Sequence, residues 1–480
     1  MEDKMQDQTP DVRPRRRRKR TRLDIIKEQY LPYLILALAA VVIVTLCVGK
    51  IRRTVQVQKA NQAAAEAESQ AAAQLEAQEK EQAAQLLTQS AALAEAYDFD
   101  GAIAALDSFT GDISKYPELL TKRAEYVQSK SQMVAWDDPS KIPNLSFQLL
   151  IADPARAFAD DIYGDAYNRN YVTTDEFSKI LQQLYDNGYM LVSLSDLVTE
   201  DAAGEGTGFS AATLYLPQGK KPLVLTQCAV NYFTYMTDGD GDGLPDKDGD
   251  GFASRLIVDS NGKIVNEMVD AQGNLITGAF DLVPILDNFL EEHPDFSYHG
   301  AKATLAVTGY DGIFGYRIDS AAKTAENTEY YNQQIEGAKA IVQALRDDGY
   351  ELACYTYEHF GYGDETADRI SQDLTSWKNE IVPVLGNVDI LVYPFGSDIA
   401  ENRADAYSGD RYNVLKEAGF RYFIGMDNTV SSWADVQSGY FRQTRKLVTG
   451  AYMTYSSSMF DGLFDSASVL NTQRGTVPQQ

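Results

Sequence analysis

Short apolar runs and longer amphipathic stretches alternate between residues 143 and 466. The run KPLVLTQ at 221–227 is typical of a buried strand, and the stretch at 173–188 has the periodicity and capping residues of a helix. The same two patterns recur towards the C-terminus. Helices of about ten to fifteen residues between short apolar strands predict βαβ units, and therefore a parallel sheet or barrel. In such folds the carboxyl ends of the strands carry the functional groups.

A long apolar run lies near the N-terminus. Residues 29–49 carry no charge, and a helix of this length rises by about 1.5 Å per residue and spans roughly 30 Å, the thickness of a bilayer core. They predict one transmembrane helix. The basic cluster at 13–22 predicts, by the positive-inside rule, a cytoplasmic tail over 1–28 and an extracellular C-terminal part of a single-pass cell-membrane protein. A cleaved signal peptide is the alternative, but the run is long and no small-residue cleavage site stands out.

Two helical regions are expected between this run and the main domain. Residues 54–95 are rich in Ala, Gln and Glu and lack Gly and Pro, which favours a helical stalk. Its leucines make only a broken heptad, so a coiled coil remains open. Residues 96–132 resemble one tetratricopeptide-type helix hairpin, which has to pack on a neighbour because a single hairpin cannot bury its own face. Residues 467–480 are expected to form a disordered tail.

The charge is unevenly distributed along the chain. The net charge is −26, but residues 1–53 carry a net charge of +7 and the remaining residues a net charge of −33, with 30 Lys+Arg against 63 Asp+Glu. Such an acidic domain excludes nucleic acid as its partner. Of the 3 cysteines, Cys47 lies in the apolar run, so at most one disulfide can form elsewhere.

Several segments resemble motifs of one enzyme family, in the family's order. Residues 221–229 resemble the strand that carries T-F-D-D, 349–359 resemble G-x-E-x-x-x-H-[ST]-x-x-H, 392–396 resemble R-x-P-[FY]-G, and 415–427 resemble the late helix and strand. The family is the polysaccharide deacetylases of the NodB type, carbohydrate esterase family 4, and the resemblance covers about residues 143–466. It implies an α/β fold with a distorted (β/α) barrel, preceded by the transmembrane helix, the stalk and the hairpin. It also implies hydrolysis of N-acetyl groups on cell-wall or other N-acetylated glycan.

The resemblance also implies a damaged catalytic site. In the family, the first Asp of T-F-D-D is the catalytic base, and the second joins two His in binding a divalent metal, usually zinc. Here Cys228 stands at the base and Ala229 at the metal-binding Asp. Tyr355 stands at the first His, His359 remains, and Val392 replaces the Arg that orients the base. Because a zinc site needs at least three protein ligands, ordinary metal-dependent deacetylation is not expected.

Several hypotheses about function remain open. The leading one is a catalytically eroded pseudoenzyme at the cell surface that binds envelope glycan or an envelope protein partner. The alternative is an active deacetylase with a rearranged site that uses His359, Cys228 and Zn2+ or another divalent metal. A third treats the barrel as a spacer for the stalk and hairpin. Cys228 could also be a thiol nucleophile with His359 as its base, or form a disulfide with Cys354.

An acidic insertion over 232–281 interrupts the resemblance. Within it, residues 237–251 read TDGDGDGLPDKDGDG and resemble the D-x-D-x-D-G calcium loops of dockerin and thrombospondin type-3 repeats. Alternating Asp residues let a loop wrap successive oxygens around one hard cation, although Gly249 stands where an EF-hand has its bidentate Glu. A flexible acidic loop is the alternative. The predicted Ca2+ ligands are Asp238, Asp240, Asp242, Asp246, Asp248 and Asp250.

Aromatic residues crowd the same motifs. Aromatic faces offer large apolar surfaces on which sugar rings stack, so a glycan-binding cleft is expected even without a metal. Phe233, Tyr235 and Tyr310 belong to this group. The predicted substrate-binding residues are Tyr232, Tyr357, Tyr393, Pro394, Phe395 and Gly396.

Overall fold

The computed structural model describes residues 22–200, 208–320, 323–324 and 327–479, so most of the predicted cytoplasmic tail lies outside the described residues. Residues 1–84 and 85–480 form two units. The helix α1 (Arg22–Glu95) runs through the apolar run and the predicted stalk, and its last residues belong to the second unit. It is long and apolar enough to cross a membrane, and its side chains from residue 30 to residue 78 are exposed.

A helical hairpin follows α1 in the second unit. It consists of α2 (Phe99–Asp107) and α3 (Pro117–Ser131), which pack against each other. The side chain of Asp98 caps the first turn of α2. Leu106 and Leu119 are buried, so the apolar periodicity of this segment corresponds to the packed face of the hairpin.

Seven parallel strands close into a barrel in the second unit, which confirms the predicted (β/α) barrel. The ring runs β2, β7, β11, β12, β13, β14 and β16, and β16 pairs with β2 to close it. Its strands are β2 (Asn144–Phe147), β7 (Lys221–Cys228), β11 (Ala303–Val307), β12 (Glu351–Cys354), β13 (Ile390–Val392), β14 (Tyr422–Met426) and β16 (Tyr440–Leu447). Outside the ring, β3 (Tyr189–Leu191) pairs with β7, and β15 (Ala434–Gln437) pairs with β16.

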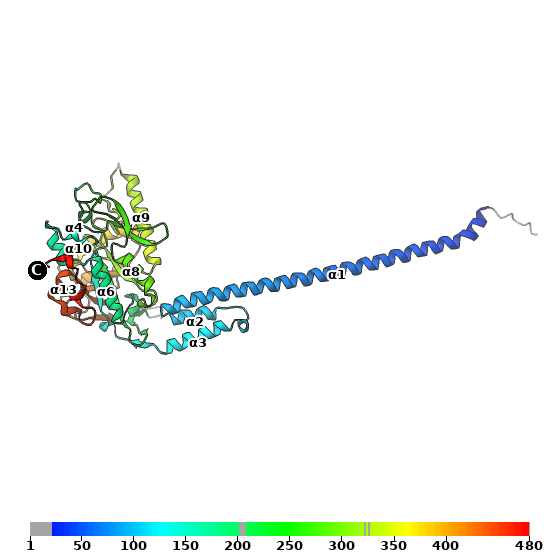
Figure 1. Cartoon of the computed structure of the whole chain (residues 1–480), viewed down its shortest axis with the longest axis horizontal. Coiled ribbons are helices and arrows are strands. Elements are labelled where there is room, and N and C mark those ends of the chain that lie inside the picture. Colours follow the sequence, from blue (N-terminus) through cyan, green and yellow to red (C-terminus); the bar gives the residue numbers. More distant parts are fainter. Residues whose placement is uncertain (1–21, 201–207, 321–322, 325–326, 480) are drawn as a thin grey trace, which may run out of the picture. The chain divides into compact units, whose positions relative to one another are not determined.

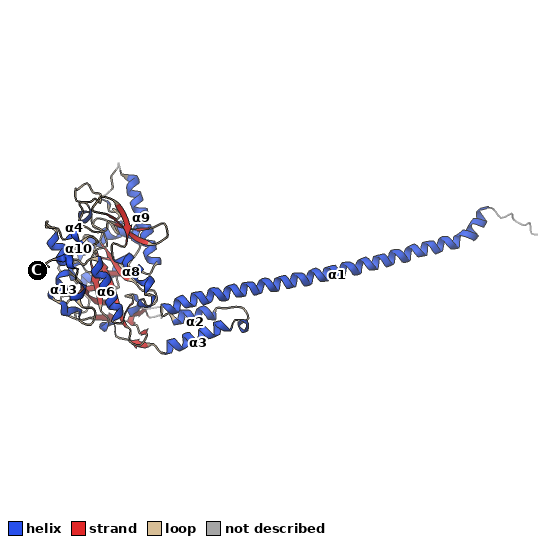
Figure 2. Ribbon diagram, in the orientation of Figure 1, coloured by secondary structure: helices blue, strands red, loops and turns tan. Residues whose placement is uncertain are grey.

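Helices surround the strands of this unit, as Figures 1 and 2 show for α6, α8 and α9. The helix α6 begins at a capping box in which Thr173 and Glu176 satisfy each other's backbone N–H groups. The helices are α4 (Pro154–Ala157), α5 (Gly164–Asn170), α6 (Thr174–Asp186), α8 (Leu282–Glu292), α9 (Thr328–Asp347), α10 (Ala367–Ser376), α11 (Val382–Leu385), α12 (Gly409–Glu417), α13 (Gly450–Tyr455) and α14 (Ser466–Val469). Their apolar faces, together with the strands, form the core.

The insertion between β7 and α8 has its own secondary structure. It contains α7 (Thr234–Thr237), the acidic loop, and a three-stranded antiparallel sheet of β8 (Arg255–Val258), β9 (Ile264–Val269) and β10 (Leu275–Gly278). Along β9, buried and half-buried residues alternate, as expected for a strand with one covered face. Two further pairs are β1 (Val134–Trp136) with β6 (Leu214–Leu216), and β4 (Val198–Glu200) with β5 (Phe209–Ala211).

A chain of buried polar side chains crosses the barrel interior. The hydroxyl of Thr226 donates to Oδ1 of Asn144 at 2.9 Å, and Nδ2 of Asn144 donates to Oε1 of Gln443 at 3.0 Å. Because side chains alternate between the two faces of a strand, Cys228 and Arg445, two residues further along, also face the interior. The sequence alternation therefore places these two side chains at the carboxyl ends of the strands.

The expected disordered tail over 467–480 is wrong for residues 467–479, which the structure describes. Arg474 is buried, and its guanidinium donates to Oε2 of Glu176 at 2.6 Å and to the main-chain oxygens of Asn168 and Tyr171, each also at 2.6 Å. A buried charge requires such a complete set of partners. The ion pair therefore holds the C-terminal segment against α6.

Candidate functional site

The backbone at the carboxyl ends of three barrel strands takes the left-handed conformation. Ala229 follows β7 with a φ of 56°, His359 follows β12 with a φ of 56°, and Phe395 follows β13 with a φ of 57°. Residues other than Gly rarely take this conformation, and where they do the surrounding packing holds them there, often at functional sites. These residues of the three motif segments therefore lie at one mouth of the barrel, on strained backbone.

Arg445 occupies the barrel centre at this mouth. Its side chain is buried, and its guanidinium donates hydrogen bonds to the main-chain oxygens of Gly425 and Tyr393, each at 3.0 Å. It also donates to the hydroxyl of Tyr355 at 3.4 Å, and its charge acts on Cys228. These partners belong to β14, β7 and the residues that follow β13 and β12. One guanidinium thus ties together the ends of four strands.

The Cys228 thiol is not activated as a nucleophile. Burial raises its pKa, and the opposing effects of Arg445 and Tyr355 do not reverse the shift. A nucleophilic cysteine needs a lowered pKa or an adjacent base. The side chains that act on this thiol, among the described residues, do not include His359. The geometry therefore gives no support to a Cys228–His359 nucleophile and base.

The open alternative of a disulfide between Cys228 and Cys354 is wrong, since both thiols are free and buried. The strand β11 lies between β7 and β12. Two strand spacings, roughly 9–10 Å, therefore separate the two cysteines. A disulfide requires Cα atoms closer than about 7 Å.

The residues at the family's metal positions do not fit a zinc ion. Ala229 offers no ligand atom, and burial raises the pKa of the Tyr355 phenol well above its usual range. The Arg445 cation lies beside Tyr355, where it would repel a dication. Among the described residues, the one group of acidic, His or Cys side chains with the spacing of a metal site lies in the insertion. With His359 as the remaining family ligand, the barrel lacks a zinc coordination set.

His359 belongs to an aromatic stack at the mouth. Its ring is stacked with that of Phe395 at a centroid distance of 5.3 Å and with that of Phe233 at 6.2 Å. Burial lowers the pKa of His359, so the imidazole is neutral at physiological pH. Phe395 is 67% exposed, an unusual value for a large apolar side chain. The stack therefore presents an aromatic face to solvent at the mouth.

Two of the predicted substrate-binding residues are placed where no ligand can reach them. Tyr232 and Tyr393 are fully buried. The hydroxyl of Tyr232 donates to Asp281 at 2.7 Å, and that of Tyr393 accepts from Tyr407 at 3.1 Å. They are correctly predicted as parts of the motif loops but wrong as contact residues, because a buried phenol needs an internal partner and these tyrosines point inward to find one.

The other predicted residues have different environments. Pro394 is buried, and Gly396 lines a cleft of about 380 Å³ that Trp433 and Arg442 also line. Tyr357 is half-buried, and its hydroxyl donates to Glu380 at 2.7 Å. Phe395 and Tyr357 are therefore the predicted aromatic residues that the structure leaves accessible.

The sequence interpretation missed Asp281, a buried carboxylate beneath the mouth. It accepts hydrogen bonds from Nε2 of Gln227 at 2.8 Å and from the main-chain N–H of Leu150 at 2.9 Å. Burial raises its pKa to about 6. Gln227 faces away from the barrel interior because its neighbour Cys228 faces into it. Asp281 therefore lies outside the barrel wall and does not replace the missing base.

The sequence did not predict a second cavity, beside the mouth, although some of its aromatic residues were among those expected to bind glycan. Its volume is about 720 Å³, and the loops after β7, β11 and β12 form it. Tyr163 and Tyr235 line it, with ring centroids 6.1 Å apart. No motif marks Tyr163, because its segment before α5 lies far from the family motifs in the sequence.

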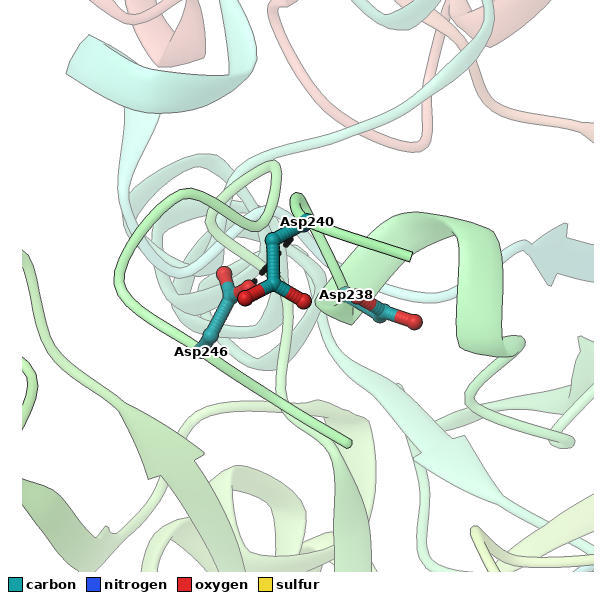
Figure 3. A group of neighbouring side chains, drawn as sticks. All are labelled: Asp238, Asp240 and Asp246. Atoms are coloured by element: carbon teal, nitrogen blue, oxygen red, sulfur yellow. Dashed lines mark hydrogen bonds between the residues drawn. The ribbon is translucent and has the colours of Figure 1, made fainter. Parts of the chain in front are cut away.

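The acidic loop brings three of its six predicted ligands together. Carboxylate oxygens of Asp238, Asp240 and Asp246 lie within 4.8 Å of one another, as Figure 3 shows. Several backbone N–H groups outweigh the effect of burial and lower the pKa of Asp246. The remaining three have other partners: Asp242 accepts from the N–H of Leu244 at 2.8 Å, Asp248 from Lys247 at 2.6 Å, and Asp250 from the hydroxyl of Tyr167 at 2.6 Å.

Comparison with solved structures finds two deacetylases with low overall similarity to this chain. The chain is similar to the Streptococcus pyogenes deacetylase PplD in complex with acetate, with 15% identity and a TM-score of 0.32 over 65% of this chain and 94% of that one. It is also similar to a de-N-acetylase from Aggregatibacter actinomycetemcomitans, with 12% identity and a TM-score of 0.35 over 67% and 99% of the two chains. No family model and no curated protein matches the sequence. Function therefore has to be argued from the residues of the site.

Proposed function

We propose that the chain is a membrane-anchored protein of the cell envelope whose deacetylase-like barrel binds glycan without hydrolysing it. The observation that carries this proposal is the position of Arg445, whose guanidinium contacts Tyr355 and acts on Cys228. These are the positions at which the deacetylase motifs have a metal-binding His and the catalytic base. A fixed cation there leaves neither a metal site nor a carboxylate base, whereas the aromatic mouth above it remains able to bind a ligand.

Two further features support glycan binding at an outer surface. The exposed ring of Phe395 and the cavity beside it offer aromatic faces and polar groups, the combination that recurs in small-molecule sites. The apolar part of α1 is long enough to anchor the chain, and the basic cluster before it favours an extracellular barrel. The proposal therefore places the barrel next to the glycans of the envelope.

The test of this proposal measures binding and hydrolysis in one preparation. The full chain in detergent micelles is titrated with amino-sugar hexamers by calorimetry, and acetate release is followed with added Zn2+, Co2+ or Mn2+. We expect binding without acetate release. Phe395→Ala should weaken binding by about 10-fold because it removes the exposed face of the stack. Tyr215→Ala, at a tyrosine on β6 that is 52% exposed, should not weaken it. Metal-dependent acetate release would contradict the proposal.

An active deacetylase with a rearranged site is the second candidate, and the observation that favours it is His359 at the mouth. It predicts that stoichiometric zinc copurifies with the chain and that His359→Ala abolishes acetate release. The assay above separates the two candidates, since the binding proposal predicts neither result. Failure to bind any glycan would favour an envelope protein as the partner instead.

Restoring the two aspartates should not restore hydrolysis. In Cys228→Asp with Ala229→Asp, the first carboxylate would lie beside Arg445 and pair with it, and Tyr355 would still replace a metal ligand. We expect no acetate release above the level of the unchanged chain. Acetate release from the double variant would show that the guanidinium leaves room for a metal.

We also propose that the acidic loop binds one Ca2+ ion through Asp238, Asp240 and Asp246. Three carboxylates in reach of one another suit a hard cation, and their mutual repulsion is relieved when the cation binds. Asp250 does not act as a ligand in this arrangement, because burial raises its pKa and it accepts a hydrogen bond from the hydroxyl of Tyr167. The ion would brace the loop that follows β7 and α7, next to the cavity at the mouth.

Calcium should therefore stabilise the chain against heat. At a Ca2+ concentration 100 times the dissociation constant, the gain is about 2.7 kcal/mol if only the folded state binds. Asp246→Asn should abolish the shift in melting temperature, whereas Asp242→Asn in the same loop should preserve most of it, since Asp242 lies outside the cluster. Equal losses in the two variants would contradict the three-residue site.

A further inference from the structure

The cavity beside the mouth combines tyrosine rings with carboxylates. Three of its tyrosines are well exposed: Tyr310 by 57%, Tyr235 by 44% and Tyr163 by 40%. Among the described residues, four acidic side chains line it and no Lys, Arg or His does; the acidic residues are Asp238, Asp311, Asp319 and Glu358. A cavity of about 720 Å³ has room for a ligand of the size of a few sugar rings.

The tyrosines of the cavity and the stack at the mouth share Phe233. Its ring is stacked with that of Tyr235 at a centroid distance of 5.7 Å and contacts that of Tyr310 at 5.9 Å. Phe233 is also stacked with His359, which is stacked with Phe395. The ring contacts are therefore continuous from the cavity to the barrel mouth, with Phe233 buried between them, and one extended ligand can contact the exposed rings at both ends.

Two of the carboxylates pair with arginines that do not line the cavity. Asp311 pairs with Arg317 at 3.2 Å and accepts from the hydroxyl of Thr234 at 2.9 Å. Glu358 pairs with Arg369 at 2.5 Å, and its side chain remains 51% exposed. Neither arginine lines the cavity, so Asp311, Asp319 and Glu358 make the surface that a ligand meets acidic even with Ca2+ at Asp238. The net charge of −33 on residues 54–480 has the same sign.

We infer that the ligand at this site is an amino-sugar glycan with free, protonated amino groups, that is, a de-N-acetylated one. This inference rests on the proposed glycan-binding function and specifies its substrate class. An ammonium group is attracted both by carboxylates and by the faces of tyrosine rings. An acetamido group is neutral and lacks both of these electrostatic attractions. An anionic glycan would be repelled. The aromatic wall meanwhile supplies the flat surface that a pyranose ring needs.

The test compares two ligands of equal length on the full chain in detergent micelles. Calorimetric titration with a hexamer of glucosamine should give a dissociation constant about 10-fold lower than titration with a hexamer of N-acetylglucosamine. The difference should shrink when salt is raised from 0.05 to 0.5 M, because the added attraction is electrostatic and is screened.

Variants inside and outside the cavity test whether the preference for the free-amine hexamer arises there. Glu358→Gln should reduce the preference for the free-amine hexamer by about threefold, because it removes one carboxylate from the cavity. Glu291→Gln is its control, since Glu291 is equally exposed (59%) and paired with Lys263 at 2.6 Å but lies outside the cavity. Tyr310→Ala should weaken binding of both hexamers, and Tyr215→Ala, which replaces a tyrosine exposed by 52%, should weaken neither.

Each outcome of the comparison decides between the two proposals. Equal or tighter binding of the N-acetylated hexamer would overturn the inference and leave glycan binding in place. Binding of neither hexamer would overturn both. A lysine hexapeptide that binds as tightly as the glucosamine hexamer would also overturn the inference, since it would show that charge alone, or a basic peptide, is what the site recognises.

Discussion

Arg445→Met is expected to lower the free energy of unfolding of the barrel by about 2–4 kcal/mol. The guanidinium donates to the main-chain oxygens of Gly425 and Tyr393 and to the hydroxyl of Tyr355, and all of these partners are enclosed at the mouth. Met fills much of the same volume but donates no hydrogen bond. Hydrogen bonds from a charged donor contribute about 1.5–3 kcal/mol each, and part of that is recovered because the buried charge disappears.

Urea unfolding of the full chain in detergent micelles, followed by tyrosine fluorescence, measures this change. Arg369→Met is the matched control, because that arginine also lies over an aromatic ring, that of Phe360, but pairs with Glu358 at the surface. Exposed ion pairs contribute little, so the control should change the midpoint much less. A midpoint that Arg445→Met leaves unchanged would mean that the four strand ends do not depend on the guanidinium.

The barrel could be predicted from the sequence because its signals are local. Apolar runs such as 221–228 and the capped helices between them specify parallel strands without reference to any distant residue. The motif segments could be placed for the same reason, since each lies directly after its strand. The alternation along β7 even determines that Cys228 faces inward while Gln227 faces Asp281 outside the barrel wall.

The contents of the site could not be predicted in the same way. Arg445 lies in the last barrel strand, and nothing near it in the sequence shows that its guanidinium reaches Tyr355, ninety residues earlier. One feature of the sequence could have indicated this role. The strand β16 is buried over most of its length and contains Arg442 and Arg445, and a buried cation needs hydrogen-bond partners in the protein. Tyr232 and Tyr393 were predicted to contact a ligand but are buried. The residue type alone does not show whether an aromatic side chain lines a cleft or packs in the core.

The structure also shows which side chains lie at the positions of the family's catalytic residues. Removing two carboxylates and one histidine from a metal site would leave polar space at the end of the barrel. Here Arg445 and the larger Tyr355 lie in that space, both are buried, and the guanidinium donates to the phenol. The aromatic stack of Phe233, His359 and Phe395 lies at the same mouth. A packed base below an exposed aromatic ring is the arrangement on which the proposal of binding without hydrolysis depends.

Glu176→Gln is expected to lower the free energy of unfolding by about 3–5 kcal/mol. The carboxylate is fully buried, accepts from Nη2 of Arg474 at 2.6 Å, and caps the start of α6 through the N–H of Thr173 at 2.7 Å. Gln has the same shape but no charge, so the guanidinium of Arg474 would stay buried without its counterion. Breaking a buried pair from one side has a cost of this size.

A double-mutant cycle with Arg474→Met tests the origin of the effect. If the ion pair is responsible, the double variant should be destabilised by clearly less than the sum of the two single changes, because no unpaired charge remains. Asp107→Asn, which breaks the exposed pair with Arg123, should have little effect. In Glu176→Gln, trypsin should also cleave at Arg474 faster than in the unchanged chain, since the C-terminal segment is released from α6. Additive single effects with an unchanged rate of cleavage would show that the segment is held by packing and that the charge pair is incidental.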